Sequence, residues 1–244
     1  MKPIQKSQGI ILKTRDYKDN SKIITILTED GMIDLILRGT NSMNSGNKKY
    51  TITPSFVEFL MSKSNTLSTF TEGFIIENYN NIKLDNYKSL INMVIVEKIL
   101  TFSTHIDNLK QFFDFCLFLF KLLDTTSYPN VVLNLFEIKL LYLIGIAPVL
   151  NHCLMCNKNE NLLFSINNGG TVCAKCSLQS GFDLNIDETE LFKYLYLIKI
   201  DKIDEDFLKI VNDLNIKLDD IIDKYYDKHI DFRSKTKKII KKVL

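Results

Sequence analysis

Two Cys-x-x-Cys pairs within 24 residues constrain this chain more than any other feature of its sequence. Cys153 and Cys156 form the first pair, Cys173 and Cys176 form the second, and sixteen residues separate the two pairs. Two intervening residues let both sulfurs of a pair turn toward one ion, and two pairs complete a tetrahedral Zn²⁺ site. Because four protein ligands leave no open coordination position, we expect a structural zinc site that holds together a segment too short to bury its own core.

The residues between the pairs favour a zinc ribbon over a redox dithiol. The sequence Asn167 to Gly170 (NNGG) predicts a hairpin turn. A redox Cys-x-x-Cys would not need a second pair at this distance. The fifth cysteine, Cys116, lies on the apolar face of a predicted helix, and we interpret it as a core residue.

The first eighty residues predict a small β-barrel. Five short runs rich in β-branched and aromatic residues are separated by polar turns, and the Asp30-Gly31 pair predicts a hairpin. The runs are residues 9–17, 22–29, 32–39, 50–63 and 66–78. Five strands in this length fit an OB-fold barrel, and an SH3-like barrel fits nearly as well from the pattern alone.

Beyond residue 80 the apolar residues recur at helical spacing. The predicted helices cover residues 86–104, 108–123, 129–145, 188–198, 204–214, 219–229 and 234–244. Asp187 and Asp204 are the predicted N-caps of two of them. We therefore expect an α+β chain with three parts: an OB-fold nucleic-acid-binding domain (1–80), a helical domain (81–150 and 180–244) and a zinc-ribbon insert (151–179).

The sequence favours a binding protein over an enzyme. It has only three histidines, which are scattered, and it has no phosphate-binding glycine loop and no H-E-x-x-H motif. It has no apolar run long enough to cross a membrane and no signal-peptide core, so we expect a cytoplasmic, nucleoid-associated protein.

Basic residues among the barrel strands suggest a surface for single-stranded nucleic acid, where cations contact phosphates and aromatic rings stack on bases. The candidates are Lys13, Arg15, Lys22, Arg38, Lys48, Lys49 and Lys63. A second basic segment begins at Lys228 and extends to residue 244; it contains seven basic residues and one acidic residue. Within it we consider Lys237, Lys238 and Lys241 as candidates for binding a protein partner.

Three segments of the chain, in order, resemble the bacterial DNA repair protein RecO family. They are GIILKTRDYKDNSKIITILTEDGMIDLILRG (9–39), LLYLIGIAPVLNHCLMC (140–156) and YYDKHIDFRSKTKKII (225–240). The resemblance spans the whole chain, including the second cysteine pair. It implies an OB-fold, a helical domain and a zinc ribbon, with Cys153, Cys156, Cys173 and Cys176 as the metal ligands.

The resemblance also implies a function without catalytic turnover. Members of the family bind single- and double-stranded DNA and anneal complementary strands. They work with RecR, often RecF, and the C-terminal tail of single-stranded-DNA-binding protein, and they help load RecA. Arg38 corresponds to the start of the family's basic loop. This chain departs from the pattern there, because its loop carries no further charge until Lys48 and Lys49.

Two other readings stay open from the residues themselves. An OB-fold and a zinc ribbon also occur together in RNA-binding or translation-associated factors, which composition and periodicity do not separate from a DNA-binding protein. A zinc-dependent enzyme would require one of the four cysteines to stay off the metal.

Overall fold

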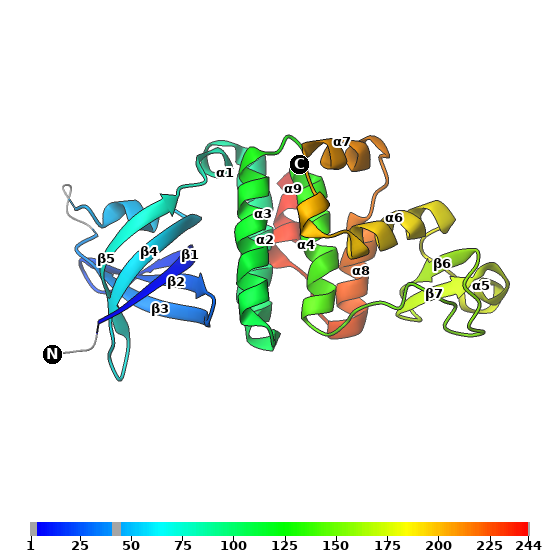
Figure 1. The fold of residues 1–244 in the computed structure, drawn as a ribbon, viewed down its shortest axis with the longest axis horizontal. Coiled ribbons are helices and arrows are strands. Elements are labelled where there is room, and N and C mark those ends of the chain that lie inside the picture. Colours follow the sequence, from blue (N-terminus) through cyan, green and yellow to red (C-terminus); the bar gives the residue numbers. More distant parts are fainter. Residues whose placement is uncertain (1–3, 41–44, 244) are drawn as a thin grey trace. The chain divides into compact units, whose positions relative to one another are not determined.

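The computed structural model describes residues 4–40 and 45–243, with side chains as far as residue 240 in the last helix (Figure 1). The chain divides into two compact units, Met1–Thr125 and Thr126–Leu244. The first unit contains a closed barrel and three α-helices, and the second contains the cysteine segment and the remaining helices.

The barrel of the first unit has five strands in the order β1-β2-β3-β5-β4, and β4 pairs back onto β1 to close it (Figure 1). The strands are β1 (Ile4–Asp16), β2 (Ser21–Thr28), β3 (Gly31–Arg38), β4 (Ser55–Ser62) and β5 (Ser68–Glu77). All neighbours are antiparallel except β3 and β5, which pair in parallel where Leu35 meets Ser68. This topology confirms the predicted OB-fold.

Alternation of inward and outward side chains builds the barrel core. In β4 every second residue from Ser55 to Met61 is buried, as expected for strands with one face inside a barrel. Gly9 allows a close approach of β1 to β2, because a Cβ there would lie 2.4 Å from the Ile26 side chain. The core side chains are Ile11, Ile24, Ile26, Leu35, Leu37, Tyr50, Val57, Phe59, Met61 and Phe70.

The hairpin between β2 and β3 differs slightly from the prediction. Thr28 pairs with Gly31, so the two loop residues are Glu29 and Asp30 rather than the Asp-Gly pair itself. Gly31 is the first residue of β3 and has a φ of 116°, a backbone conformation that residues with a side chain rarely adopt.

Three α-helices complete the first unit: α1 (Asn80–Leu84), α2 (Asn86–Phe102) and α3 (Leu109–Thr125). Asp85 caps α2 by accepting hydrogen bonds from the backbone N–H groups of Tyr87 and Lys88. These helices belong to the same compact unit as the barrel, which extends to Thr125. The predicted domain limits at residues 80, 150 and 179 stay predictions.

The helices of the second unit surround one apolar helix. Apart from the short α5 (Ala174–Ser180) of the cysteine segment, they are α4 (Pro129–Leu143), α6 (Ile186–Leu197), α7 (Glu205–Asp213), α8 (Asp219–Ile230) and α9 (Lys235–Val243). Ten residues of α4 are buried, as expected for a central helix. Asp204 is the N-cap of α7 as predicted, whereas α6 is capped by Asn185 in a capping box with Glu188 rather than by Asp187. Within the described residues, no helix combines the length and the apolar character needed to cross a membrane.

Candidate metal centre and nucleic-acid interface

The cysteine segment folds as a two-stranded ribbon. Strands β6 (Leu162–Ser165) and β7 (Gly170–Cys173) form a hairpin in which Ser165 pairs with Gly170. Gly169 ends the turn with a φ of 71°, which confirms the turn predicted from the Asn-Asn-Gly-Gly sequence. The hairpin therefore delivers Cys173 at the end of its second strand.

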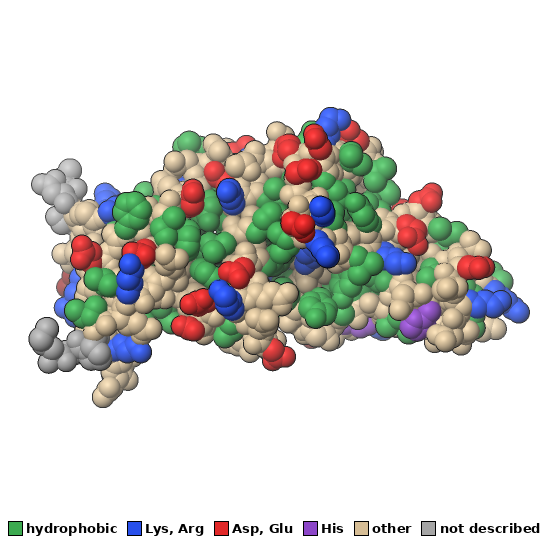
Figure 2. All heavy atoms as spheres, viewed as in Figure 1, with side chains coloured by type: hydrophobic (Ala, Val, Ile, Leu, Met, Phe, Trp, Pro, Cys, Tyr) green, Lys and Arg blue, Asp and Glu red, His purple; other side chains and the backbone are tan. Residues whose placement is uncertain are grey.

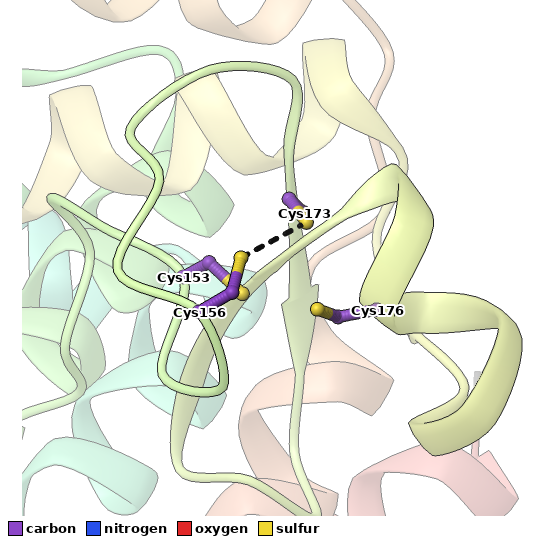
Figure 3. A group of neighbouring side chains, drawn as sticks. All are labelled: Cys153, Cys156, Cys173 and Cys176. Carbon is purple, nitrogen blue, oxygen red and sulfur yellow. Dashed lines mark hydrogen bonds between the residues drawn. The ribbon is translucent and has the colours of Figure 1, made fainter.

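Local backbone structure brings the other cysteines to the same place (Figure 3). The first pair lies on a tight turn in which Asn157 N–H donates to the Cys153 carbonyl at 2.8 Å, and Asn157 is in the left-handed region. Helix α5 (Ala174–Ser180) starts directly after Cys173, so Cys176 lies within its first turn. In Figure 3 the four side chains converge from the turn, the strand end and the helix.

The sulfur positions suit one metal ion. All four Sγ atoms lie within 4.8 Å of one another, and Cys156 Sγ lies 3.6 Å from Cys173 Sγ. A tetrahedral Zn²⁺ with Zn–S bonds of about 2.3 Å separates its sulfurs by about 3.8 Å. The four cysteines could therefore hold a metal ion with little rearrangement.

The thiols influence one another's ionisation. Burial raises the pKa of the Cys153 thiol, but backbone N–H groups, that of Cys173 first, outweigh it and lower this pKa to about 6. The pKa of Cys176 rises to about 12, chiefly through its hydrogen bond to Cys173. The cluster thus favours some thiolates and disfavours others when no cation is bound. Neighbouring thiolates repel one another through their negative charges. A divalent cation would offset this repulsion, because cysteines bind a metal ion as thiolates.

Two of the predicted DNA-binding residues share a groove on the barrel. Lys13 and Arg15 of β1 line a groove of about 490 Å³ together with residues of β2, β3 and the end of α2. Arg15 Nη2 lies 3.1 Å from Asp34 Oδ2, so part of its charge is offset. Ser103 and Thr104, in a short 3-10 helix (Ser103–His105), add two hydroxyl-bearing side chains to the groove.

Most of the other predicted DNA-binding residues lie toward one end of the barrel. The register pairs Ser21 with Arg38 and Asp16 with Lys22, so the end of β1, the start of β2 and the end of β3 are neighbours. The side-chain amide of Asn47 donates to the Arg38 carbonyl at 2.9 Å. This bond holds Asn47, which directly precedes a short 3-10 helix, against that end of the barrel.

The 3-10 helix that follows Asn47 (Lys48–Thr51) carries two of the predicted basic residues. Lys48 and Lys49 are both exposed, and Lys49 Nζ lies 4.9 Å from the Tyr50 ring centroid. Lys22 Nζ pairs with Asp16 at 2.5 Å. Residues 41–44 of the predicted basic loop lie outside the described part of the chain.

Lys63 is separated from this group. It follows β4, whose last residue, Ser62, pairs with Ile4 at the start of β1, the strand end opposite Arg15. On the face drawn in Figure 2, basic and acidic side chains are interspersed rather than gathered into areas of one sign. This face therefore carries no large area of positive charge.

The C-terminal lysines have different environments. Lys238 is exposed on α9, and the side chain of Lys241 lies outside the described part of the chain. The sequence suggests Lys237 as a partner-binding surface lysine, but the structure buries it. Its ammonium lies 2.8 Å from Glu137 Oε2 and 2.9 Å from Asp223 Oδ1, which anchors α9 to α4 and α8.

Glu137 and the two hydroxyl residues of the groove are not among the residues predicted from the sequence. Glu137 is fully buried in the most apolar helix, and a lone acid among apolar neighbours was the available signal. Nothing in the sequence around Ser103 and Thr104 distinguishes them, because they line the groove only through the position of the end of α2 beside the barrel.

A five-stranded OB-type barrel, a second unit built mainly of helices and a four-cysteine cluster that could hold a metal define the class of protein by its architecture. Residues 103–238 match the family described as Recombination protein O C terminal, and residues 1–79 match Recombination protein O N terminal. The chain therefore belongs to the RecO family.

Curated relatives agree with this assignment over almost the entire chain. The chain is 26% identical to the DNA repair protein RecO of Bacillus subtilis over 241 residues, which cover 97% of this chain and 94% of the relative. It is 25% identical to that of Halalkalibacterium halodurans, covering 96% and 93%, and 21% identical to that of Listeria monocytogenes, covering 98% and 95%.

Proposed function

We propose that this protein is a recombination mediator in DNA repair that binds single-stranded DNA, anneals complementary strands and helps load RecA together with RecR. The observation that carries the proposal is the combination of RecO-family membership with a groove on the barrel that presents Lys13 and Arg15. It acts as a scaffold for strands and proteins, without turnover of a small substrate.

Binding would rest on phosphate contacts with little base preference. Lys13, in the groove, and Arg38, Lys48 and Lys49, at one end of the barrel, are exposed and supply four cations. Arg15 and Lys22 are paired with aspartates, so they would contribute less. Four phosphates neutralised on a single strand correspond to a slope of log K against log salt of about −3.

Annealing would follow from the same neutralisation. Two complementary strands repel each other through their phosphates, and a basic surface that holds one of them lowers this repulsion. Double-stranded DNA, the product, would be bound through the same contacts to its backbone.

The bound metal would be Zn²⁺ in a structural role. The four donors are thiolate sulfurs, which favour zinc in a tetrahedral site. Because the cysteines would fill all four coordination positions, none would be open to a substrate. The metal would join the turn at Cys153, the end of β7 and the start of α5 into one rigid ribbon.

The protein partners would be RecR, the C-terminal tail of single-stranded-DNA-binding protein and, in some settings, RecF. An acidic tail of that kind would be attracted by exposed lysines of α9 such as Lys238, whereas the buried Lys237 would not reach it.

Annealing of two labelled complementary oligonucleotides across a salt series tests the proposal. We expect acceleration at low salt that declines as salt rises, and equal rates with and without protein at every salt concentration would refute it. A matched RNA pair serves as competitor. Stronger competition by RNA than by DNA would favour an RNA-binding factor instead.

A further inference from the structure

Helices α6 and α7 of the second unit expose apolar side chains to solvent. Four of these side chains are each more than half exposed: Tyr194 and Leu197 on α6, and Ile210 and Leu214 on α7. The rings of Tyr194 and Phe207 of α7 have centroids 5.8 Å apart, so the two helices are neighbours. Figure 2 shows hydrophobic side chains at the surface over both helices. Single exposed apolar residues are ordinary, but a group of them on adjacent helices is typical of a contact surface.

Helical spacing joins the four side chains into one surface, which we call the α6–α7 face. Tyr194 and Leu197 are three positions apart, so they are neighbours on the exposed side of α6. Ile210 and Leu214 follow Phe207 by three and seven positions, which places all three along one side of α7. Because that side contacts α6 through Phe207, the face extends across both helices.

Acidic residues occupy the same exposed sides of the two helices. Asp187 and Glu190 precede Tyr194 by seven and four positions. Asp206 precedes Ile210 by four positions, and all three acids are exposed. Among the residues that the structure describes, none of these acids takes part in a salt bridge or accepts a hydrogen bond through its side chain. The face therefore carries carboxylates that have no ion-pair partner within the part of the chain described.

The other charges of this region are mostly engaged. Helices α6 and α7 and the residues between them contain eight acidic residues and four lysines. Glu188 and Asp204 cap the two helices, and Glu205 accepts a backbone N–H. Two of the four lysines pair with aspartates of the same region, Lys193 is half-buried, and Lys199 lies beyond the end of α6. The exposed charge that remains on the α6–α7 face is therefore negative.

This charge selects the kind of partner. Three unpaired carboxylates would repel the phosphates of DNA and acidic protein segments, whereas they would attract a cationic segment. The apolar side chains require a partner with an apolar side of its own, and an amphipathic helix on a helical surface meets this requirement. Glu190 and Leu197 are about 10 Å apart along α6, so the basic and apolar residues of the partner should lie about two turns apart.

We propose that the α6–α7 face binds a basic amphipathic helix of a partner protein. The partner's apolar residues pack on the four apolar side chains of the face, and its lysines or arginines pair with the three exposed carboxylates. This partner differs from DNA and from the acidic tail, which the proposed function assigns to the barrel and to α9. The inference is therefore independent of DNA binding.

Binding of a fluorescent model peptide to the full chain, followed by anisotropy, tests this proposal. The probe is a peptide of leucine and lysine, about 18 residues long, with its leucines at helical spacing. A second peptide of the same composition alternates leucine and lysine, so a helix formed by it would have no single apolar side. We expect the first peptide to bind about tenfold or more tightly than the second at about 50 mM salt.

Variants of the face locate the binding site. Leu197→Ser combined with Ile210→Ser should weaken binding of the helical peptide about tenfold or more, because both side chains are apolar anchors. The matched control is Leu84→Ser combined with Leu178→Ser, on α1 and α5, which removes two side chains that are even more exposed and should leave binding unchanged. Far-UV circular dichroism checks that each variant is folded. Equal affinities of the two double variants, or no binding by the unaltered protein, overturn the proposal.

Glu190→Lys tests the electrostatic part of the proposal. It should weaken binding of the helical peptide severalfold at about 50 mM salt and less at about 300 mM, because salt screens the introduced charge. Asp107→Lys makes the same change in net charge at an exposed position of the first unit, and it should have a smaller effect at low salt. Equal effects of the two replacements would count against an acidic docking surface on α6.

Sedimentation velocity of the protein without peptide tests a second copy of this chain as the occupant. The proposal predicts that the unaltered protein and the Leu197→Ser, Ile210→Ser variant sediment alike. An oligomer that this double variant dissociates would assign the face to self-association and overturn the proposal of a basic partner.

Discussion

Replacing Lys237 with methionine should destabilise the second unit strongly. Lys237 is 8% exposed and Glu137 is fully buried, and their charged atoms are 2.8 Å apart. Asp223 and Asp219 lie 2.9 and 3.8 Å from the same ammonium. Burial alone lowers the pKa of Lys237, but the charges of Glu137 and Asp223 outweigh it and raise the pKa above the ordinary lysine value. The attraction within the network therefore exceeds the cost of burying the ammonium.

The expected loss is about 3–5 kcal/mol, because methionine leaves the Glu137 carboxylate buried without its ammonium partner. At an m-value of about 2 kcal/mol/M, this lowers the midpoint of urea unfolding by roughly 2 M. Since the pKa of Lys237 is raised on folding, its contribution is fully present at neutral pH and is lost only as pH rises above the ordinary lysine range.

Urea unfolding followed by far-UV circular dichroism measures this effect. Lys238→Met is the matched control, because Lys238 is the next residue on α9 and is exposed, and it should change stability by less than about 0.5 kcal/mol. A double replacement, Lys237→Met with Glu137→Met, should recover much of the loss, since it removes both buried charges. Equal midpoints for Lys237→Met and Lys238→Met would refute the reasoning.

Two further predictions concern the ribbon. Replacing Cys173 and Cys176 together with serine should abolish metal binding and expose residues 151–179 to hydrogen exchange, whereas Cys116→Ala, outside the cluster, should leave the metal content unchanged; retained metal in the double variant would contradict the assigned ligands. Gly170→Ala should cost about 1–3 kcal/mol in urea unfolding, because its Cβ would lie 2.3 Å from the Val149 carbonyl oxygen. Gly46→Ala is its control, because a Cβ at Gly46 would meet no atom of the described residues within 4 Å. Equal stability of the two variants would count against the close packing at Gly170.

The parts of the molecule that could be predicted from sequence are those that depend on neighbouring residues. The strands of the barrel follow from alternating apolar residues, and the four-cysteine cluster follows from the spacing of its two cysteine pairs. The hairpin that joins the pairs also has a local cause, the conformational freedom of Gly169. These features can be predicted from the sequence because the residues that form each of them lie within one turn or one hairpin.

The remaining features depend on contacts between distant residues. Lys237 and Glu137 are 100 positions apart, and nothing beside Lys237 distinguishes it from its exposed neighbour Lys238. The groove beside Lys13 likewise requires α2 to end against the outer face of the barrel. The cap of α6 is a different case, because Asn185 and Glu188 form a capping box that the sequence itself contains, two residues before the predicted cap Asp187.

The equilibrium binding of a fluorescent single-stranded oligonucleotide, measured by anisotropy across a salt series, tests the central claim most directly. The account predicts tight binding at about 50 mM salt and a slope of log K against log salt of about −3. Lys13→Ala should reduce that slope by about 0.7, whereas Lys121→Ala, exposed on α3, should leave it unchanged. Absence of binding at low salt, or a slope that Lys13→Ala and Lys121→Ala change equally, would contradict it.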